Sequence, residues 1–316
     1  MGDIGEFGLI EAIRRRLPVG QGVLVGPGDD AAVVAAPDAR VVVTTDVLVD
    51  GVHFRRDWSA PDDIGHRAAA ASLADVAAMG ARPTALVVGL AVPPDLPTAW
   101  VLRLADGVRD EAAVVGASLV GGDVVRGEQL SVSVAALGDL AGRDPVTRAG
   151  GQVGDVVAVC GRLGWAQAGL TVLRRGFASP RVVVAAHRRP EPPYPAGPAA
   201  AVAGATAMID VSDGLIADLE HVARASGVQI RLDLASLTPD GPLLEVASAF
   251  GLDAVDWVLT GGDDHALAAT FPSGVDLPDG FRLIGAVTAT EETSAEPRVL
   301  VPGHAVSGTG GHRHFG

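Results

Sequence analysis

The chain has 316 residues, of which 48% are hydrophobic and 20% are charged, and its formal net charge is −14. This composition is typical of an ordered globular protein with room for two domains, and the acidic charge argues against nucleic acid as a partner. Lysine and asparagine are absent from the sequence, which excludes both the lysine-containing phosphate loop and the protein-kinase catalytic centre. Any bound ATP must therefore be held by arginine, backbone amides and metal-bound carboxylates.

The sequence also bears on the cellular compartment. The N-terminal stretch MGDIGEFGLIEAIRRRL lacks the apolar core of a signal peptide, and no apolar run reaches the length of a membrane span. A single cysteine, Cys160, excludes an internal disulfide, and its apolar surroundings, VVAVCG, predict a buried small hydrophobic residue. We expect a cytoplasmic protein with no membrane partner.

In the first half of the chain, helical periodicity alternates with short β-branched runs. The alanine-rich segment after PDD has a clear start and a glycine stop, and it carries one carboxylate, Asp75, in mid-helix. The predicted elements are a helix over 8–17, strands over 33–37 and 40–46, a helix over 62–80, a strand over 84–92, a helix over 97–116, and strands over 117–123 and 129–138.

Glycines at 150, 151 and 154 open a second α/β unit. The proline-rich segment RRPEPPYPAGP predicts a surface loop, and TAMID predicts a buried strand that leads into a helix. The predicted elements are a strand over 156–161, a helix over 164–175, the loop over 188–198, a strand over 206–210, a helix over 212–227, and strands near 228–232, 265–271 and 281–287.

Carboxylates recur where apolar elements stop, often after glycine. Asp29 and Asp30 follow GPG, and the same pattern recurs in the segments TTD (44–46), LVGGD (119–123), MIDVSD (208–213) and VLTGGDD (258–264). A turn or a helix cap explains any one of them, and Asp213 could cap the helix that follows it. Six such places, with Asp75 in mid-helix, instead favour a cluster of oxygen ligands for Mg²⁺ and a polyphosphate.

Six motifs in this order, GPGDDAAVV, TTDVLVDGVHF, ASLADVAAMGA, LVGGD, DVSDGL and LTGGDDHAL, resemble the bacterial thiamine-monophosphate kinase family. The resemblance covers essentially the whole chain and places it in the aminoimidazole ribonucleotide synthetase superfamily. It implies an α/β (α+β), two-domain PurM-like fold, with an N-terminal ATP/Mg-binding and dimerisation domain over 1–148 and a C-terminal α/β domain over 149–316. In the family, the N-terminal sheets of two subunits form a β-barrel, so a homodimer is expected.

The resemblance also implies an activity, which is transfer of the γ-phosphoryl group of ATP to thiamine monophosphate with several Mg²⁺ ions. It assigns magnesium ligation to Asp30, Thr44, Thr45, Asp46, Asp75, Asp123, Asp210 and Asp213. Contacts to ATP are implied for Gly122, Asp123, Arg148 and Ser212, and substrate contacts for His53, Asp263 and Phe315, with Arg148 and Asp75 as the catalytic residues.

The side chains present in the sequence suit the chemistry of this phosphoryl transfer. The acceptor is already a phosphate oxyanion, so the reaction needs charge neutralisation and no general base. Arg148 suits a phosphate clamp, although the segment VTRAGG alone also fits a solvated arginine in a linker. His53 alone could be a polar residue at a strand end, and Phe315 could stack on a heterocycle or be incidental.

One segment departs from the family pattern, and it keeps two alternatives open. The family commonly has Gly-Gly-Glu-Asp-Tyr-Glu where this chain has Gly-Gly-Asp263-Asp264-His265-Ala266. The alternatives are another ATP-dependent synthetase of the superfamily and a non-catalytic nucleotide or thiamine-phosphate binding protein. A selenophosphate synthetase is disfavoured because Cys160 is far from the N-terminus, and an EF-hand calcium protein lacks its spaced aspartate loop.

Overall fold

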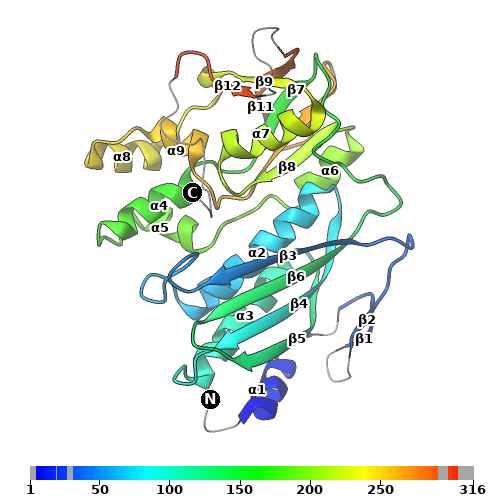
Figure 1. The fold of residues 1–316 in the computed structure, drawn as a ribbon, viewed down its shortest axis with the longest axis vertical. Coiled ribbons are helices and arrows are strands. Elements are labelled where there is room, and N and C mark those ends of the chain that lie inside the picture. Colours follow the sequence, from blue (N-terminus) through cyan, green and yellow to red (C-terminus); the bar gives the residue numbers. More distant parts are fainter. Residues whose placement is uncertain (1–4, 19, 27–30, 291–297, 305–316) are drawn as a thin grey trace. The chain divides into compact units, whose positions relative to one another are not determined.

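The computed structural model describes residues 5–18, 20–26, 31–290 and 298–304. Two of the predicted site residues, Asp30 and Phe315, lie outside these ranges. Backbone contacts divide the chain into two compact units, which are drawn in Figure 1. Unit 1 comprises Met1–Val76 and Ala81–Gly142, and unit 2 comprises Ala77–Gly80 and Arg143–Gly316. Within the described ranges, no helix is long and apolar enough to cross a membrane.

Unit 1 is built on a four-stranded sheet in the order β3-β6-β4-β5 (Figure 1). The strands are β3 (Val42–Val49), β4 (Arg82–Val92), β5 (Ser118–Arg126) and β6 (Ser131–Asp139). β6 pairs antiparallel with β3 and β4, whereas β4 and β5 are parallel and are connected through a helix, as parallel neighbours require. A separate two-stranded ribbon joins β1 (Val23–Val25) and β2 (Val33–Val34), so the strand predicted over 33–37 is much shorter than expected.

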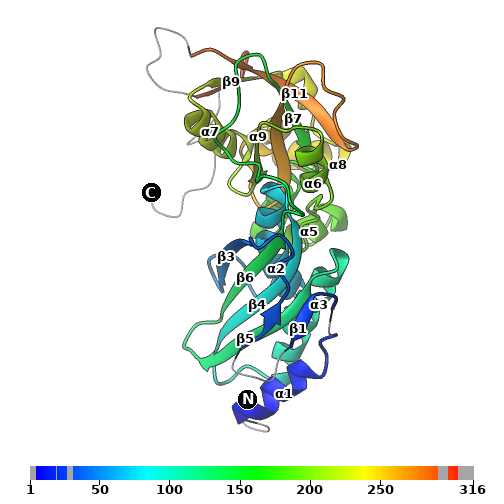
Figure 2. The ribbon, with the colours of Figure 1, turned by 90° about the vertical axis from the view of Figure 1, so that its right-hand side faces the viewer.

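Two long helices, α2 (Pro61–Ala78) and α3 (Thr98–Val114), cover one face of this sheet (Figures 1 and 2). They approach each other closely because glycines lie at the crossing: a Cβ on Gly65 would collide with the Leu104 carbonyl, and one on Gly107 with the Asp62 carbonyl. The short helix α1 (Gly5–Arg14) packs against α3. Leu73, Leu86 and Leu104 are fully buried between these layers.

The opposite face of the unit 1 sheet carries exposed apolar side chains. Strand alternation turns Val43 and Val47 of β3 away from α2, and they are 68% and 51% exposed. Val87 of β4 and Val125 of β5 are also exposed. Such a face is unusual for a sheet side that is open to solvent, which is normally polar.

Unit 2 contains a six-stranded sheet in the order β12-β9-β11-β7-β10-β8. The strands are β7 (Val156–Cys160), β8 (Ala207–Val211), β9 (Gln229–Leu232), β10 (Ala266–Phe271), β11 (Phe281–Thr288) and β12 (Val299–Leu300). Every residue of β8 and β10 is buried, and β10 lies between β7 and β8 in antiparallel register. The prediction that Cys160 is buried is confirmed, since it is 6% exposed.

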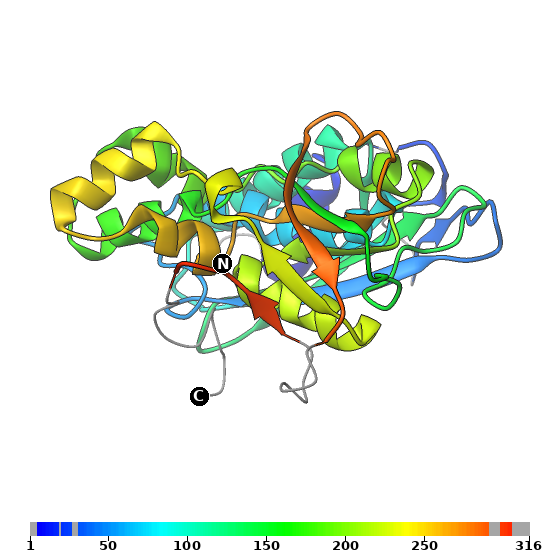
Figure 3. The same cartoon turned by 90° about the horizontal axis from the view of Figure 1, so that it is seen from above.

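Helices pack around this sheet, and α7 (Leu215–Ser226) lies against β8. Three of them, α4 (Trp165–Arg174), α5 (Arg181–Arg188) and α8 (Gly241–Phe250), form a layer at one end of the unit (Figure 3). Shorter pieces complete the unit: α6 (Ala196–Val202), the 3₁₀ turn η1 (Leu234–Ser236) and α9 (Ala254–Thr260).

The prediction of a surface loop over 188–198 is only partly confirmed, because a loop does connect α5 and α6 over 189–195 but much of it is not on the surface. Pro190, Pro192 and Tyr194 are buried, and the segment ends in α6. Proline marks a break in regular structure but says nothing about burial, and its apolar ring packs well in a core. The sequence analysis also missed α5, α8 and α9, which are short, and in α5 three consecutive valines follow the first residue and favour a strand locally.

Candidate functional site

The central carboxylates of unit 1 come from a strand and a helix that face each other. Thr44 and Asp46 are two residues apart on β3, so both point toward α2, where Ser72 and Asp75 lie three residues apart on one helix face. The Thr44 hydroxyl donates to Asp75 Oδ2 over 2.6 Å, and the Ser72 hydroxyl donates to Asp46 Oδ2 over 2.7 Å. The structure therefore brings together three of the predicted metal ligands, Thr44, Asp46 and Asp75.

These groups form a set of hard oxygen donors with two negative charges. Hydroxyl and carboxylate oxygens are the ligands that Mg²⁺ takes in proteins, usually together with water and phosphate oxygens. Among the described residues, no group of three or more His, Cys, Asp or Glu side chains is gathered tightly enough to hold a metal ion without other ligands. The donor set fits an ion that is shared with a phosphate substrate.

Three other predicted residues of unit 1 are placed differently. The Thr45 side chain is exposed on the opposite face of β3 from Thr44. Gly122 and Asp123 lie on β5, paired with Val88 and Gly89 of β4, and both are exposed. A Cβ on Gly122 would collide with the Val88 carbonyl, so this position requires glycine.

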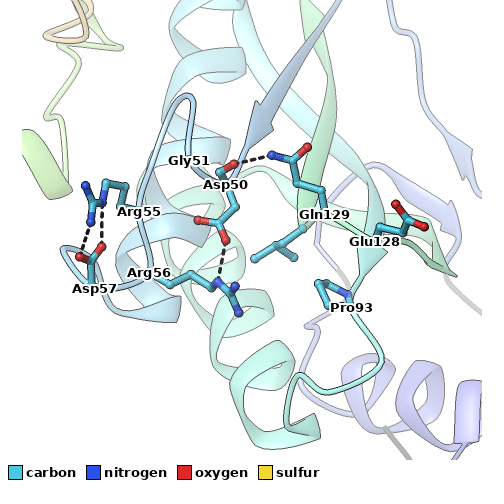
Figure 4. A pocket seen from close by; sticks show the side chains of 9 residues that line it. Asp50, Gly51, Arg55, Arg56, Asp57, Pro93, Glu128 and Gln129 are labelled. Atoms are coloured by element: carbon cyan, nitrogen blue, oxygen red, sulfur yellow. Dashed lines mark hydrogen bonds and ion pairs between the residues drawn. The ribbon is translucent and has the colours of Figure 1, made fainter.

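The loop that follows β3 holds His53. Its Nδ1 accepts a hydrogen bond from the Val49 amide over 3.0 Å, so in the neutral ring Nε2 carries the proton and is the donor. A cavity of about 540 Å³ lies beside this loop, and Figure 4 shows Arg56 and Gln129 directed at Asp50 within it. Arg56 Nε donates to Asp50 Oδ2 over 2.6 Å. None of the described residues that line this cavity is a predicted metal ligand.

In unit 2, Asp210 and Asp213 occupy the end of β8 and the turn into α7. Asp210 is 5% exposed, and its Oδ2 lies 3.0 Å from His265 Nδ1. Asp213 does not cap α7, because the N-cap residue is Gly214 and no side-chain cap is formed. The turn is held instead by Asp218, whose Oδ2 accepts from the amides of Ser212, Asp213 and Gly214, each over 3.0 Å.

Asp218 is a buried carboxyl group close to Asp210. Burial, followed by the negative charge of Asp210, raises the pKa of Asp218 to about 7, while the amides of Gly214 and Asp213 act in the opposite direction. A carboxylate that accepts three amide bonds fixes the backbone around Ser212.

The turn 261–266 lies directly against this loop. Its Asp263 and His265 amides donate to the Ser212 and Val211 carbonyls over 2.8 and 2.9 Å, and both residues have positive φ (67° and 52°). A Cβ on Gly262 would collide with the Ser212 carbonyl. The predicted substrate residue Asp263 is therefore held within a few ångströms of Ser212 by backbone hydrogen bonds.

Asp264, in the same turn, is buried in the interior of unit 2. Its Oδ1 accepts from the Ala166 amide over 2.8 Å in the first turn of α4, and among the described residues Oδ2 has no hydrogen-bond partner. Burial raises the pKa of Asp264 to about 7. Asp264 thus connects the turn to the N-terminal end of α4.

Arg148 lies in an exposed segment near the start of unit 2. Its carbonyl accepts from the Ser226 hydroxyl over 2.9 Å, which fixes the backbone. Its side chain is exposed, and no described residue forms an ion pair with the guanidinium. Such a guanidinium is available to an anionic ligand.

The sequence analysis missed Ser72, Asp218 and the positioning contacts of Asp264 and His265. A helical-face argument could have found Ser72, since it precedes Asp75 by three residues. Asp218 resembles an ordinary residue in the first turn of a helix, and its role depends on how the preceding loop folds back.

Comparisons with known proteins agree with this arrangement. Residues 28–140 match the family described as AIR synthase related protein, N-terminal domain. Over 314 residues, the chain is 48% identical to a thiamine-monophosphate kinase of Mycobacterium tuberculosis, with 99% of this chain and 92% of the relative covered.

Solved structures are similar over nearly the whole chain. A thiamine-monophosphate kinase from Stenotrophomonas maltophilia superposes with a TM-score of 0.81 at 34% identity, covering 96% of this chain and 98% of that one. A structure described as AaThiL complexed with AMPPCP and TMP superposes with a TM-score of 0.80 at 31% identity, covering 100% and 98%. The predicted α/β fold class is confirmed by these matches.

Proposed function

The chain belongs to the thiamine-monophosphate kinase family, and we propose that it transfers the γ-phosphoryl group of ATP to the phosphate of thiamine monophosphate, giving thiamine diphosphate and ADP. The similarity over nearly the whole chain, 48% identity across 314 residues, carries this proposal. The related structure described as holding AMPPCP and TMP supports an ATP-like nucleotide and a thiamine phosphate as the two substrates.

We propose that the carboxylates of both units hold Mg²⁺ ions. The oxygen donors of Thr44, Asp46 and Asp75 support this, because hard oxygen ligands next to a phosphate substrate suit Mg²⁺. The full proposed ligand set is Asp30, Thr44, Thr45, Asp46, Asp75, Asp123, Asp210 and Asp213. When bound, Mg²⁺ neutralises phosphate charge so that two phosphates can approach each other.

The remaining predicted residues would contact the substrates. Gly122, Asp123 and Ser212 would bind ATP, and the exposed guanidinium of Arg148 would clamp a transferring or departing phosphate. His53, with Nε2 as its donor, would contact thiamine monophosphate, as would Asp263 and Phe315. The Asp263 side chain is one methylene shorter than the glutamate that is common in the family. The positive φ of Asp263 and the hydrogen bond from its amide to the Ser212 carbonyl fix the backbone position from which this side chain extends.

The proposed chemistry is a direct in-line transfer. The acceptor oxygen of thiamine monophosphate is already anionic, so no side chain has to remove a proton from it. The residues of this chain therefore bind and orient the two substrates and neutralise the charge of their phosphates, and no phosphoenzyme is formed. Detection of a phosphorylated protein during turnover would contradict this step.

We also propose that two copies of the chain associate through the exposed apolar face of the unit 1 sheet. Val43, Val47, Val87 and Val125 on this face support the proposal, since burying such a surface is favourable. The use of ATP and the single cysteine support a cytoplasmic enzyme.

The test is to incubate the purified chain with ATP, Mg²⁺ and thiamine monophosphate and to separate the products by chromatography. We expect thiamine diphosphate and ADP in equal amounts, and neither without Mg²⁺. Nucleotide binding with no ADP above background would instead indicate a non-catalytic binding protein. ADP without thiamine diphosphate would indicate a different acceptor, as in another synthetase of the superfamily.

A further inference from the structure

His265 forms a buried pair with Asp210 at the end of β8. His265 Nδ1 lies 3.0 Å from Asp210 Oδ2, and the two side chains are 7% and 6% exposed. Because a carboxylate oxygen can only accept, Nδ1 carries the proton of this hydrogen bond. No described residue donates to the other carboxylate oxygen, Oδ1, which leaves that oxygen for a ligand.

The backbone holds the imidazole in this place from two sides. The His265 amide donates to the Val211 carbonyl over 2.9 Å, and the next residue, Ala266, begins β10 and pairs with Val211. The φ of 52° at His265 lies in the left-handed region, which histidine and asparagine tolerate better than most residues. The pairing of β10 with β8 therefore places the His265 ring next to Asp210.

We propose that His265 is a positioning residue, which orients the Asp210 carboxylate so that Oδ1 is presented to a divalent cation. The proposal rests on the proposed function, since Asp210 acts there as a magnesium ligand. Groups behind a ligating carboxylate fix its rotation and leave a defined oxygen for the ion. Without His265, the buried carboxylate would lose the described donor to its Oδ2, and the hydrogen bond that fixes its rotation about χ2 would be gone.

The experiment uses Mn²⁺ as the metal probe and measures its binding by electron paramagnetic resonance, in the presence of AMPPCP. Asparagine places its amide nitrogen where histidine has Nδ1 and accepts the left-handed backbone, so H265N keeps the donor. H265G also suits the backbone but removes the donor. Exposed His221 on α7 provides a matched control, H221N.

We expect H265G to weaken Mn²⁺ binding about 10- to 100-fold, while H265N and H221N stay within about threefold of the wild type. In turnover, H265G should raise the Mg²⁺ concentration needed for half-maximal rate by a similar factor. Equal Mn²⁺ binding by H265G and the wild type, with both proteins folded by circular dichroism, would overturn the proposal.

A second pair of variants covers the case in which H265G does not fold. Glutamine places its nitrogen near the position of Nε2, which is not the atom that faces Asp210, so H265Q should bind Mn²⁺ more weakly than H265N. Equal binding by these two variants would overturn the proposal. Failure of the wild type to form thiamine diphosphate would count against the proposed function alone, because Mn²⁺ binding is measured separately.

Discussion

Thr44 and Asp75 are 31 residues apart in the sequence, yet the Thr44 hydroxyl donates to Asp75 Oδ2 over 2.6 Å. The bond joins an edge strand, β3, to the last turn of α2, so Asp75 lies closer to the end of its helix than the sequence analysis expected. A half-buried carboxylate is costly unless a donor faces it, and the Thr44 hydroxyl is such a donor for Asp75.

The first prediction concerns this hydroxyl. Thr44→Val keeps the side-chain shape but removes the donor, and we expect kcat to fall about 10-fold or more because Asp75 loses its orientation. Thr44→Ser keeps the donor and should retain activity close to the wild type. The measurement is kcat of both variants by steady-state kinetics at saturating ATP. Equal values for the Val and Ser variants would show that the hydroxyl has no role.

The second prediction concerns the charge on Asp75. Asp75→Asn preserves the shape and can still accept from Thr44, but it removes the negative charge, so we expect a loss of about 100-fold or more in turnover with little change in folding. Asp110→Asn on α3, at a side chain that is 67% exposed, is the control. Near-normal activity of Asp75→Asn at ordinary Mg²⁺ would refute the metal assignment in unit 1.

The third prediction concerns the turn that carries Asp263. Gly262→Ala would drive a Cβ into the Ser212 carbonyl, so the turn must shift and the free energy of unfolding should fall by about 1–3 kcal/mol. Gly241→Ala is the matched control, since a Cβ there meets nothing within 4 Å. Urea unfolding measures both, and the KM for thiamine monophosphate should rise for Gly262→Ala only.

The fourth prediction concerns pH. Burial raises the pKa of Asp264 to about 7 in the folded chain, from the ordinary aspartate value of 3.8. A raised pKa means that the folded state binds the proton more tightly, so this group's contribution to stability is complete below the unfolded pKa and is lost as pH rises toward 7. The slope from this one group is at most about 1.4 kcal/mol per pH unit.

Asp264→Asn removes this titration, because an amide does not ionise. We expect the stability of the variant relative to the wild type to rise between about pH 5 and about pH 8, as measured by urea unfolding at both values. Any fixed cost of burying the amide cancels in this comparison. A difference that does not change with pH would mean that Asp264 is already ionised at pH 5.

The fifth prediction concerns the exposed face of the unit 1 sheet. Val47→Asp places a charge on this face, and if the face joins two copies, the mass measured by light scattering should halve. Val114→Asp, at a residue that is 69% exposed on α3, should leave the mass unchanged. A wild-type chain that is monomeric at all concentrations would contradict the proposed dimer.

Much of the fold could be predicted from local pattern. Helix periodicity and the glycine stop located α2 within two residues at each end, and the buried strand β8 was evident from TAMID. The short helices α5, α8 and α9 could not be found this way, because seven to ten residues carry too little periodicity and the valines of α5 favour a strand. The burial of Pro190 and Tyr194 also depends on packing with residues far away in the chain.

The sequence by itself determined the family, through the order of its motifs, and it predicted which residues would carry the chemistry, because a chain without lysine must bind phosphates through carboxylates, arginine and glycine. Only the tertiary structure decided how these residues are supported. It paired Thr44 with Asp75, placed Ser72 behind Asp46, and set His265 against Asp210. The physical reason is that a buried carboxylate must find a donor, and which donor reaches it depends on strand register and helix packing rather than on distance along the chain.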